Sequence, residues 1–89
     1  MVLLSMFSRP VQGEKIMHYP VYFENSHGVR RIIGQAKNGS DVIDIVNKFL
    51  EEHNFKCYYV QTYKANSEWV IDVGSHTEFF YVSDVIDLN

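Results

Sequence analysis

Residues 40–54 read SDVIDIVNKFLEEHN, and this stretch carries the clearest periodic pattern in the chain. Its apolar side chains recur at i, i+3, i+4, i+7 and i+8, the spacing of one helix face; they are Val42, Ile45, Val46, Phe49 and Leu50. Ser40 can cap the first turn, and His53-Asn54 can end the helix. The stretch therefore predicts a helix over residues 41–53 whose apolar side packs on a sheet.

Two strands are predicted before this helix. In residues 18–24, Tyr19, Val21 and Phe23 occupy alternate positions, a period of two that is typical of a half-buried strand. Pro20 has no N–H for a ladder, so we expect the strand to start there or to lie at an edge. Residues 25–28 (NSHG) have the composition of a turn, and residues 29–36 resume the strand pattern. The two strands predict a hairpin.

Three strands are predicted after the helix, over residues 55–63, 68–73 and 79–82, separated by short turns. The order ββαβββ predicts an α+β two-layer sandwich. Its five-stranded, mostly antiparallel sheet carries the one helix on one face. The pattern leaves open whether Phe79 and Tyr81 or Phe80 and Val82 are the buried side chains of the last strand.

The 89 residues are enough for one core and one domain. We place this domain at residues 18–83, after an N-terminal extension over residues 1–17. A C-terminal tail over residues 84–89 is expected to be an exposed end. Met6 and Met17 are both candidate native starts, and the strand pattern begins only after Met17.

Charge and cysteine content narrow the classes of protein. The net charge is −3, and no dense basic face of the kind that binds nucleic acid generically is evident. Cys57 is the single cysteine, which excludes a disulfide scaffold and favours a reducing, cytoplasmic location. The apolar opening residues 1–7 are far too short for a spanning helix and lack a basic flank, so we expect neither an export signal nor a membrane anchor.

The sequence predicts no catalytic residue, no metal site and no cofactor. No common phosphate-binding, zinc-protease or hydrolase motif occurs. The four histidines lack the spacing of metal ligands; they are His18, His27, His53 and His76. Cys57 lies within an aromatic stretch, so we expect a buried thiol that reacts slowly. An enzyme built around Cys57 or the histidines is the weakest of three hypotheses.

An interaction face is predicted on the side of the sheet opposite the helix. If Phe55, Cys57 and Tyr59 face the helix, regular alternation turns Tyr58 and its neighbours away from it. The residues assigned to this face are Tyr58, Val60, Val70 and Tyr22. A surplus of aromatic and branched side chains there predicts a homodimer or a complex with another protein. The alternative is that the opening segment folds back over this face within one chain.

The leading functional hypothesis is a small non-enzymatic protein-interaction or regulatory module. The alternative is a single-stranded nucleic-acid binder in which Tyr22 and Tyr58 stack on bases while Arg30 or Arg31 holds phosphate. Consecutive strand residues point to opposite faces, so the two arginines cannot both join one basic patch. No RNP-like sequence supports this alternative.

Overall fold

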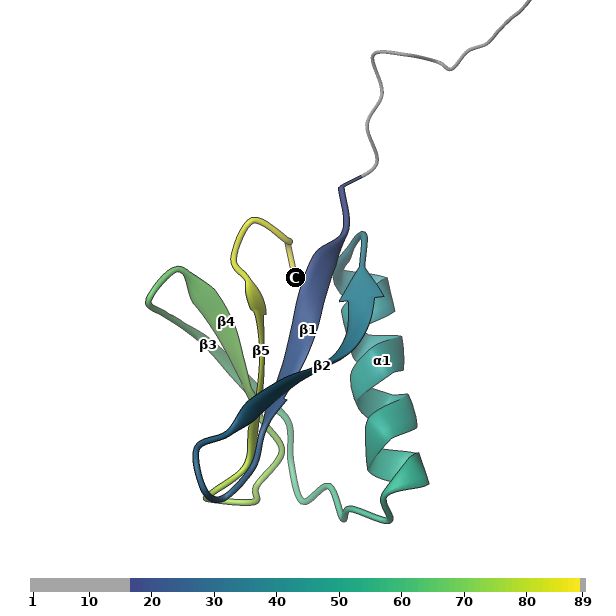
Figure 1. Ribbon diagram of the computed structural model, residues 1–89, viewed down its shortest axis with the longest axis vertical. Helices are drawn as coiled ribbons and strands as arrows, with labels where there is room; N and C mark the ends of the chain where they lie inside the picture. The colour runs from purple at the N-terminus through teal and green to yellow at the C-terminus, as the bar shows by residue number, and fades with distance from the viewer. Residues whose placement is uncertain (1–16, 89) are drawn as a thin grey trace, which may run out of the picture.

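The computed structural model describes residues 17–88, and in them five strands form one antiparallel sheet with a single helix packed beside it (Figure 1). The elements are β1 (Tyr19–Glu24), β2 (Arg30–Ala36), α1 (Gly39–Glu52), β3 (Gln61–Ala65), β4 (Glu68–Asp72) and β5 (Phe79–Ser83). The order ββαβββ and the two-layer α+β class confirm the sequence prediction. Nearly all of the predicted N-terminal extension, residues 1–16, lies outside the described residues.

The sheet order is β2-β1-β5-β4-β3, so the last strand lies between the N-terminal hairpin and the β3–β4 hairpin. Both β1–β5 and β4–β5 pair antiparallel, which joins the two hairpins into one sheet. Pro20 is the second residue of the inner strand β1. Of the two positions expected for it, the strand start is therefore right. Among the described strands, β2 and β3 are the edges.

Asn38, and not Ser40, caps α1. The Asn38 side chain accepts a hydrogen bond from the Asp41 N–H at 2.9 Å, and Asp41 Oδ2 accepts one from the Lys37 N–H at 2.9 Å. The predicted cap at Ser40 is wrong, because the Asn38 side chain satisfies the Asp41 N–H and the helix therefore starts at Gly39. The Asp41 side chain satisfies a second backbone donor, the N–H of Lys37 before the cap. Asp41 in the first turn also suits the helix dipole.

The core lies between α1 and the sheet, as the periodicity of residues 40–54 predicts. Val42, Val46, Phe49 and Leu50 are buried, and Ile45 is half-buried against the core. The ring centroids of Phe23 and Phe49 are 4.5 Å apart, and those of Phe49 and Phe80 are 5.6 Å apart in an edge-on arrangement. Phe80 and Val82 are the buried side chains of the last strand, which answers the question that its pattern left open.

The C-terminal residues complete the core. Trp69 Nε1 donates a hydrogen bond to the Ile86 carbonyl at 2.7 Å, Ile86 is buried, and Leu88 packs against the core. Figure 1 shows α1 alongside β1 and β2, whereas β3 and β4 lie at the end of the sheet away from the helix. The C-terminal segment therefore helps to cover Trp69 of β4. The expectation of an exposed C-terminal end is wrong for Ile86 and Leu88.

The segment before β3 is irregular. The predicted strand over residues 55–63 is shorter in the structure, because regular pairing begins only at Gln61. Cys57 is exposed, and its thiol lies 3.5 Å from the Tyr59 carbonyl oxygen. The prediction of a buried Cys57 is therefore wrong, and so is the expected core-facing side for Cys57 and Tyr59. Both predictions assumed strand alternation, which does not hold outside a ladder.

Candidate interaction surface

The face of the sheet opposite α1, which we call the open face, carries one row of large side chains across all five strands. The cross-strand pairs are Tyr22–Ile32, Tyr22–Tyr81, Tyr81–Val70 and Val70–Tyr63. Directly opposed residues in antiparallel strands point to the same face. Their chain neighbours Phe23, Phe80 and Ile71 lie in the core, so this row faces away from the helix.

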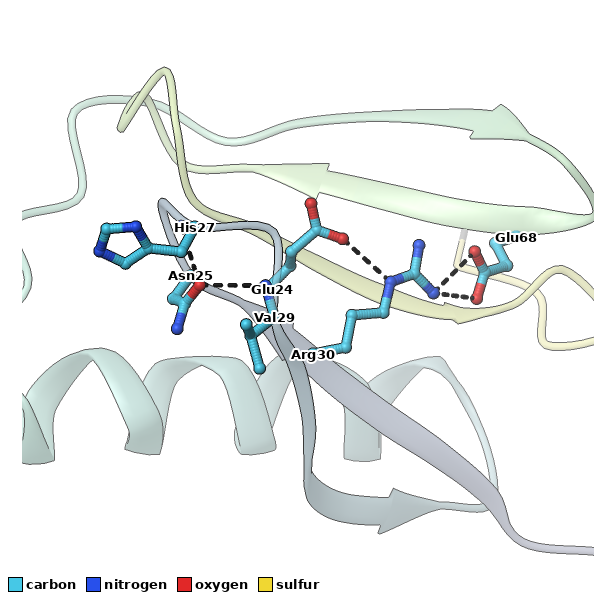
Figure 2. A network of polar contacts seen from close by, with 6 residues as sticks. All are labelled: Glu24, Asn25, His27, Val29, Arg30 and Glu68. Carbon is cyan, nitrogen blue, oxygen red and sulfur yellow. Dashed lines mark hydrogen bonds and ion pairs between the residues drawn. The ribbon is translucent and has the colours of Figure 1, made fainter.

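Arg30 lies across the centre of the open face. Its Nε is 3.0 Å from Glu24 Oε1, and its Nη1 is 2.9 Å from Glu68 Oε2, 38 residues away in the chain (Figure 2). Its guanidinium lies 3.7 Å from the centroid of the Tyr81 ring. The cation is therefore held between two carboxylates and stacked on an aromatic ring, an arrangement for which the planar guanidinium is suited.

This network shifts the pKa values of its members. Burial lowers the pKa of Arg30, but hydrogen bonds to Glu68 and Glu24 outweigh it and raise that pKa overall. Burial, followed by the charge of Glu24, raises the pKa of Tyr81, while Arg30 partly offsets the rise. Arg30 therefore stays charged, and Tyr81 stays neutral throughout the physiological range.

Of the four residues predicted for the interaction face, two are well exposed. Tyr58 is 67% exposed and Val60 is 61% exposed. Val70 lies on the open face, as the alternation indicates, but only 5% of it is exposed, so it offers little area to a partner. Tyr22 is half-buried in the row between Ile32 and Tyr81, and its ring centroid is 5.9 Å from the Arg30 guanidinium. Within the open-face row the exposed apolar area thus lies at the two edges, on Ile32 of β2 (54% exposed) and on Tyr63 of β3 (44% exposed).

We call Tyr58, Tyr59, Val60 and Tyr63 the tyrosine edge, because they lie in β3 or directly before it. All four side chains are between 44% and 67% exposed. Tyr63 belongs to the open-face row, and the Tyr59 hydroxyl lies 3.4 Å from Asp72 Oδ2. Partial desolvation of the Tyr59 hydroxyl, together with the charge of Asp72 beside it, raises the pKa of Tyr59. Sequence reasoning missed Tyr63, although its alternation with Thr62 and Lys64 was a usable signal.

Gly74 supports the start of the tyrosine edge. It is buried with φ +92°, and a Cβ there would lie 2.8 Å from the Tyr58 Cβ and 3.2 Å from the Tyr59 ring. The Tyr58 N–H donates to the Val73 carbonyl at 3.0 Å. A shallow groove of about 590 Å³ opens here, lined by Phe55, Lys56, Tyr58, Tyr59, Gly74, Ser75 and His76. The backbone of Tyr58 is therefore held to the chain directly after β4.

The residues of the nucleic-acid hypothesis are not brought together. Arg30 is occupied by two carboxylates. Arg31 is paired opposite Phe23, and its guanidinium lies 5.5 Å from the centroid of the core ring Phe49, which places it on the helix side of the sheet. Tyr22 is in the row beside Arg30, whereas Tyr58 lies in the irregular segment before the edge strand β3.

The other candidate residues are separate from one another. His18, His27, His53 and His76 are all exposed, and the His53 ring lies 4.1 Å from the Phe49 ring centroid. Within residues 17–88, no three His, Cys, Asp or Glu side chains are grouped as a metal site would require. No helix in the described part of the chain is long and apolar enough to cross a membrane.

Comparison with known proteins finds no family model, no curated protein and no solved structure that matches this chain.

Proposed function

We propose that this chain is a small, non-enzymatic protein-interaction module that binds its partner through the tyrosine edge. One observation carries the proposal: four large side chains, each at least 44% exposed, occur within residues 58–63, in the edge strand β3 or directly before it. Tyrosine suits such a surface because its ring contributes apolar area while its hydroxyl stays hydrated at the rim. A cytoplasmic location belongs to the same proposal and rests on the lone Cys57.

The free edge of β3 adds backbone groups to this surface. The described residues place no strand beyond β3, so one side of its backbone has no ladder partner. Such an edge can accept an extended segment of another chain, in which backbone hydrogen bonds contribute affinity and side chains contribute selectivity. Aromatic contact area and free backbone donors thus occur on the same five residues of β3 and the three before it.

The paired charges at the centre of the open face are a second reason to assign the contact surface to the β3 side. Arg30, Glu24 and Glu68 already satisfy one another there. Breaking that network would leave these charged side chains unpaired. A protein that binds at the tyrosine edge therefore gains more binding free energy than one that binds over Arg30. The same pairing leaves Arg30 less free to bind phosphate, which makes the nucleic-acid alternative the weaker one.

The test compares two charge-introducing variants of matched exposure. Tyr58→Lys/Val60→Lys alters the tyrosine edge, whereas Val85→Lys alters a residue that is 69% exposed in the C-terminal segment. Immobilised wild-type protein should retain either a differently tagged second copy or one defined protein, and the double variant should lose at least about tenfold of that binding. Val85→Lys should retain it.

Circular dichroism first establishes that both variants are folded, as expected for exposed positions. The proposal is wrong if the wild-type protein stays monomeric at high micromolar concentration and retains nothing. Equal binding by the wild type and the double variant would also exclude the tyrosine edge as the contact surface.

A further inference from the structure

We infer that the partner at the tyrosine edge is a second copy of this chain, added antiparallel along β3 so that a two-fold axis passes beside Tyr63. This inference rests on the proposed function and specifies its partner and its register. The result is a continuous ten-stranded sheet, twice the five strands of one copy. An isologous two-fold contact is the commonest kind among homo-oligomers.

The direction of the free backbone groups follows from the β3–β4 turn. Asn66 and Ser67, both with positive φ, form a two-residue loop between the paired residues Ala65 and Glu68. In such a hairpin the residues flanking the loop exchange both hydrogen bonds, and bonded pairs then alternate along the ladder. Thr62 and Lys64 therefore turn their N–H and C=O groups toward the free edge.

These directions allow few symmetric registers. A two-fold axis beside Tyr63 pairs Thr62 of each copy with Lys64 of the other. Each of these two pairs exchanges two backbone hydrogen bonds, which gives four in total. A two-fold beside Lys64 would put two lysines directly opposite each other, which is unfavourable. A two-fold beside Thr62 would instead oppose Tyr63 of each copy to the polar Gln61 of the other. The Tyr63 register opposes the two tyrosines and continues the aromatic row into the second copy.

The charge at this edge does not block a second copy. Edge lysines commonly protect sheets from pairing. Here the Lys64 ammonium lies 4.9 Å from the centroid of the Trp69 ring, over the neighbouring strand β4. Residues 58–63 read YYVQTY and carry no charged side chain, although the whole chain has a net charge of −3. Two copies can therefore approach along β3 without opposing like charges.

The area available is that of a weak dimer. A tyrosine offers about 150–250 Å² when fully buried, and the tyrosine edge holds three tyrosines and one valine, each roughly half exposed. Their side chains supply at most about 400 Å² per copy, or about 800 Å² for two copies, on that scale, because residues 58–60 lie opposite the β3–β4 turn of the partner. The paired backbone brings the total toward the lower end of specific interfaces, about 1,200 Å². We therefore expect a dimer that dissociates on dilution.

Disulfide trapping tests the register. In the Cys57→Ser background, Tyr63→Cys places two thiols on opposed residues about 4.5 Å apart at Cα, within the range that a disulfide bridges. Gln61→Cys is the matched control on the same strand and face. In the Tyr63 register its two copies lie four residues apart along the ladder, about 13 Å, which is beyond disulfide reach.

Under mild oxidation Tyr63→Cys should cross-link at least about tenfold faster than Gln61→Cys. In sedimentation equilibrium the protein should show a concentration-dependent dimer. Thr62→Pro, which removes an outward N–H from each copy, should weaken this dimer about tenfold. Ile32→Pro, at the other edge strand, should leave dimer affinity unchanged.

Equal cross-linking of the two cysteine variants, or faster cross-linking of Gln61→Cys, overturns the inference. A wild-type protein that stays monomeric at about 500 μM overturns it as well, because the inference requires a dimer that forms in the micromolar range. If such a monomer still captures one protein in a manner sensitive to Tyr58→Lys/Val60→Lys, the inference fails while the proposed function stands. If neither a second copy nor another protein binds, both fail.

Discussion

Phe49→Ala probes the contact between helix and sheet on which the whole fold depends. Phe49 is 5% exposed in the middle of the apolar side of α1. Its ring centroid lies 4.5 Å from that of Phe23, 5.6 Å from that of Phe80 and 6.0 Å from that of Phe55. The substitution removes one ring from a cluster to which β1, β5 and the segment before β3 contribute.

The expected loss is large for a domain of this size. Truncating a buried phenylalanine to alanine costs about 3–5 kcal/mol of unfolding free energy, because burial is lost and a cavity remains. Aromatic pairs add about 0.5–1.5 kcal/mol each, so we place Phe49→Ala near 4–5 kcal/mol. A chain of 89 residues has a total unfolding free energy of roughly 4–13 kcal/mol at the usual value per residue. The variant therefore loses between a third and all of its stability.

Urea unfolding, followed by circular dichroism and by the fluorescence of the single tryptophan Trp69, measures this loss. With a slope near 1–1.5 kcal/mol/M, the midpoint should fall by about 3–5 M, or the variant should be unfolded without urea. Ile43→Ala is the control on the exposed side of the same helix and should change stability by less than about 0.5 kcal/mol. A loss below about 1 kcal/mol for Phe49→Ala, or equal losses for the two variants, would refute the packing described.

Three further predictions concern the segment before β3, the turn after β4 and the open face. The exposed thiol of Cys57 should react with an aromatic disulfide reagent in the native protein almost as fast as in urea, and tenfold native protection would contradict its exposure. Gly74→Ala should lower the unfolding free energy by about 1–3 kcal/mol, because φ is +92° and the new Cβ would meet Tyr58 at 2.8 Å. Gly28→Ala, at φ +76° with nothing within 4 Å, should cost less, and equal melting temperatures would count against the contact. Burial raises the pKa of Tyr81, so the unfolded chain loses that proton first and stability should fall as pH rises above about 10. Alkaline absorbance titration of Tyr81→Phe should lack one of the ionisation steps that the wild type shows above the usual tyrosine range, and an unchanged titration would contradict this.

Local patterns were sufficient to predict the elements. The five apolar side chains spaced along residues 40–54 predict both the helix and its buried side, because the spacing of apolar residues within one helix shows which side faces the core. The alternation around Val21 and Phe23 predicts the first hairpin in the same way. A surplus of aromatic and branched side chains was also visible in the sequence at Tyr58 and Val60, since one helix covers only one face of a five-stranded sheet.

What the sequence by itself determined is therefore the helix, the hairpins, the ββαβββ order and the concentration of aromatic residues directly after the helix. Only the tertiary structure decided which distant residues meet. The placement of β5 beside β1 brings Arg30 of β2 within reach of Glu68 of β4, and it encloses Val70 in a row of larger side chains. The return of Ile86 over Trp69 and the irregular segment that exposes Cys57 are likewise tertiary. The period of apolar residues and the composition of turns indicate contacts within about one element. Pairing between distant strands depends on long-range contacts that no local pattern encodes.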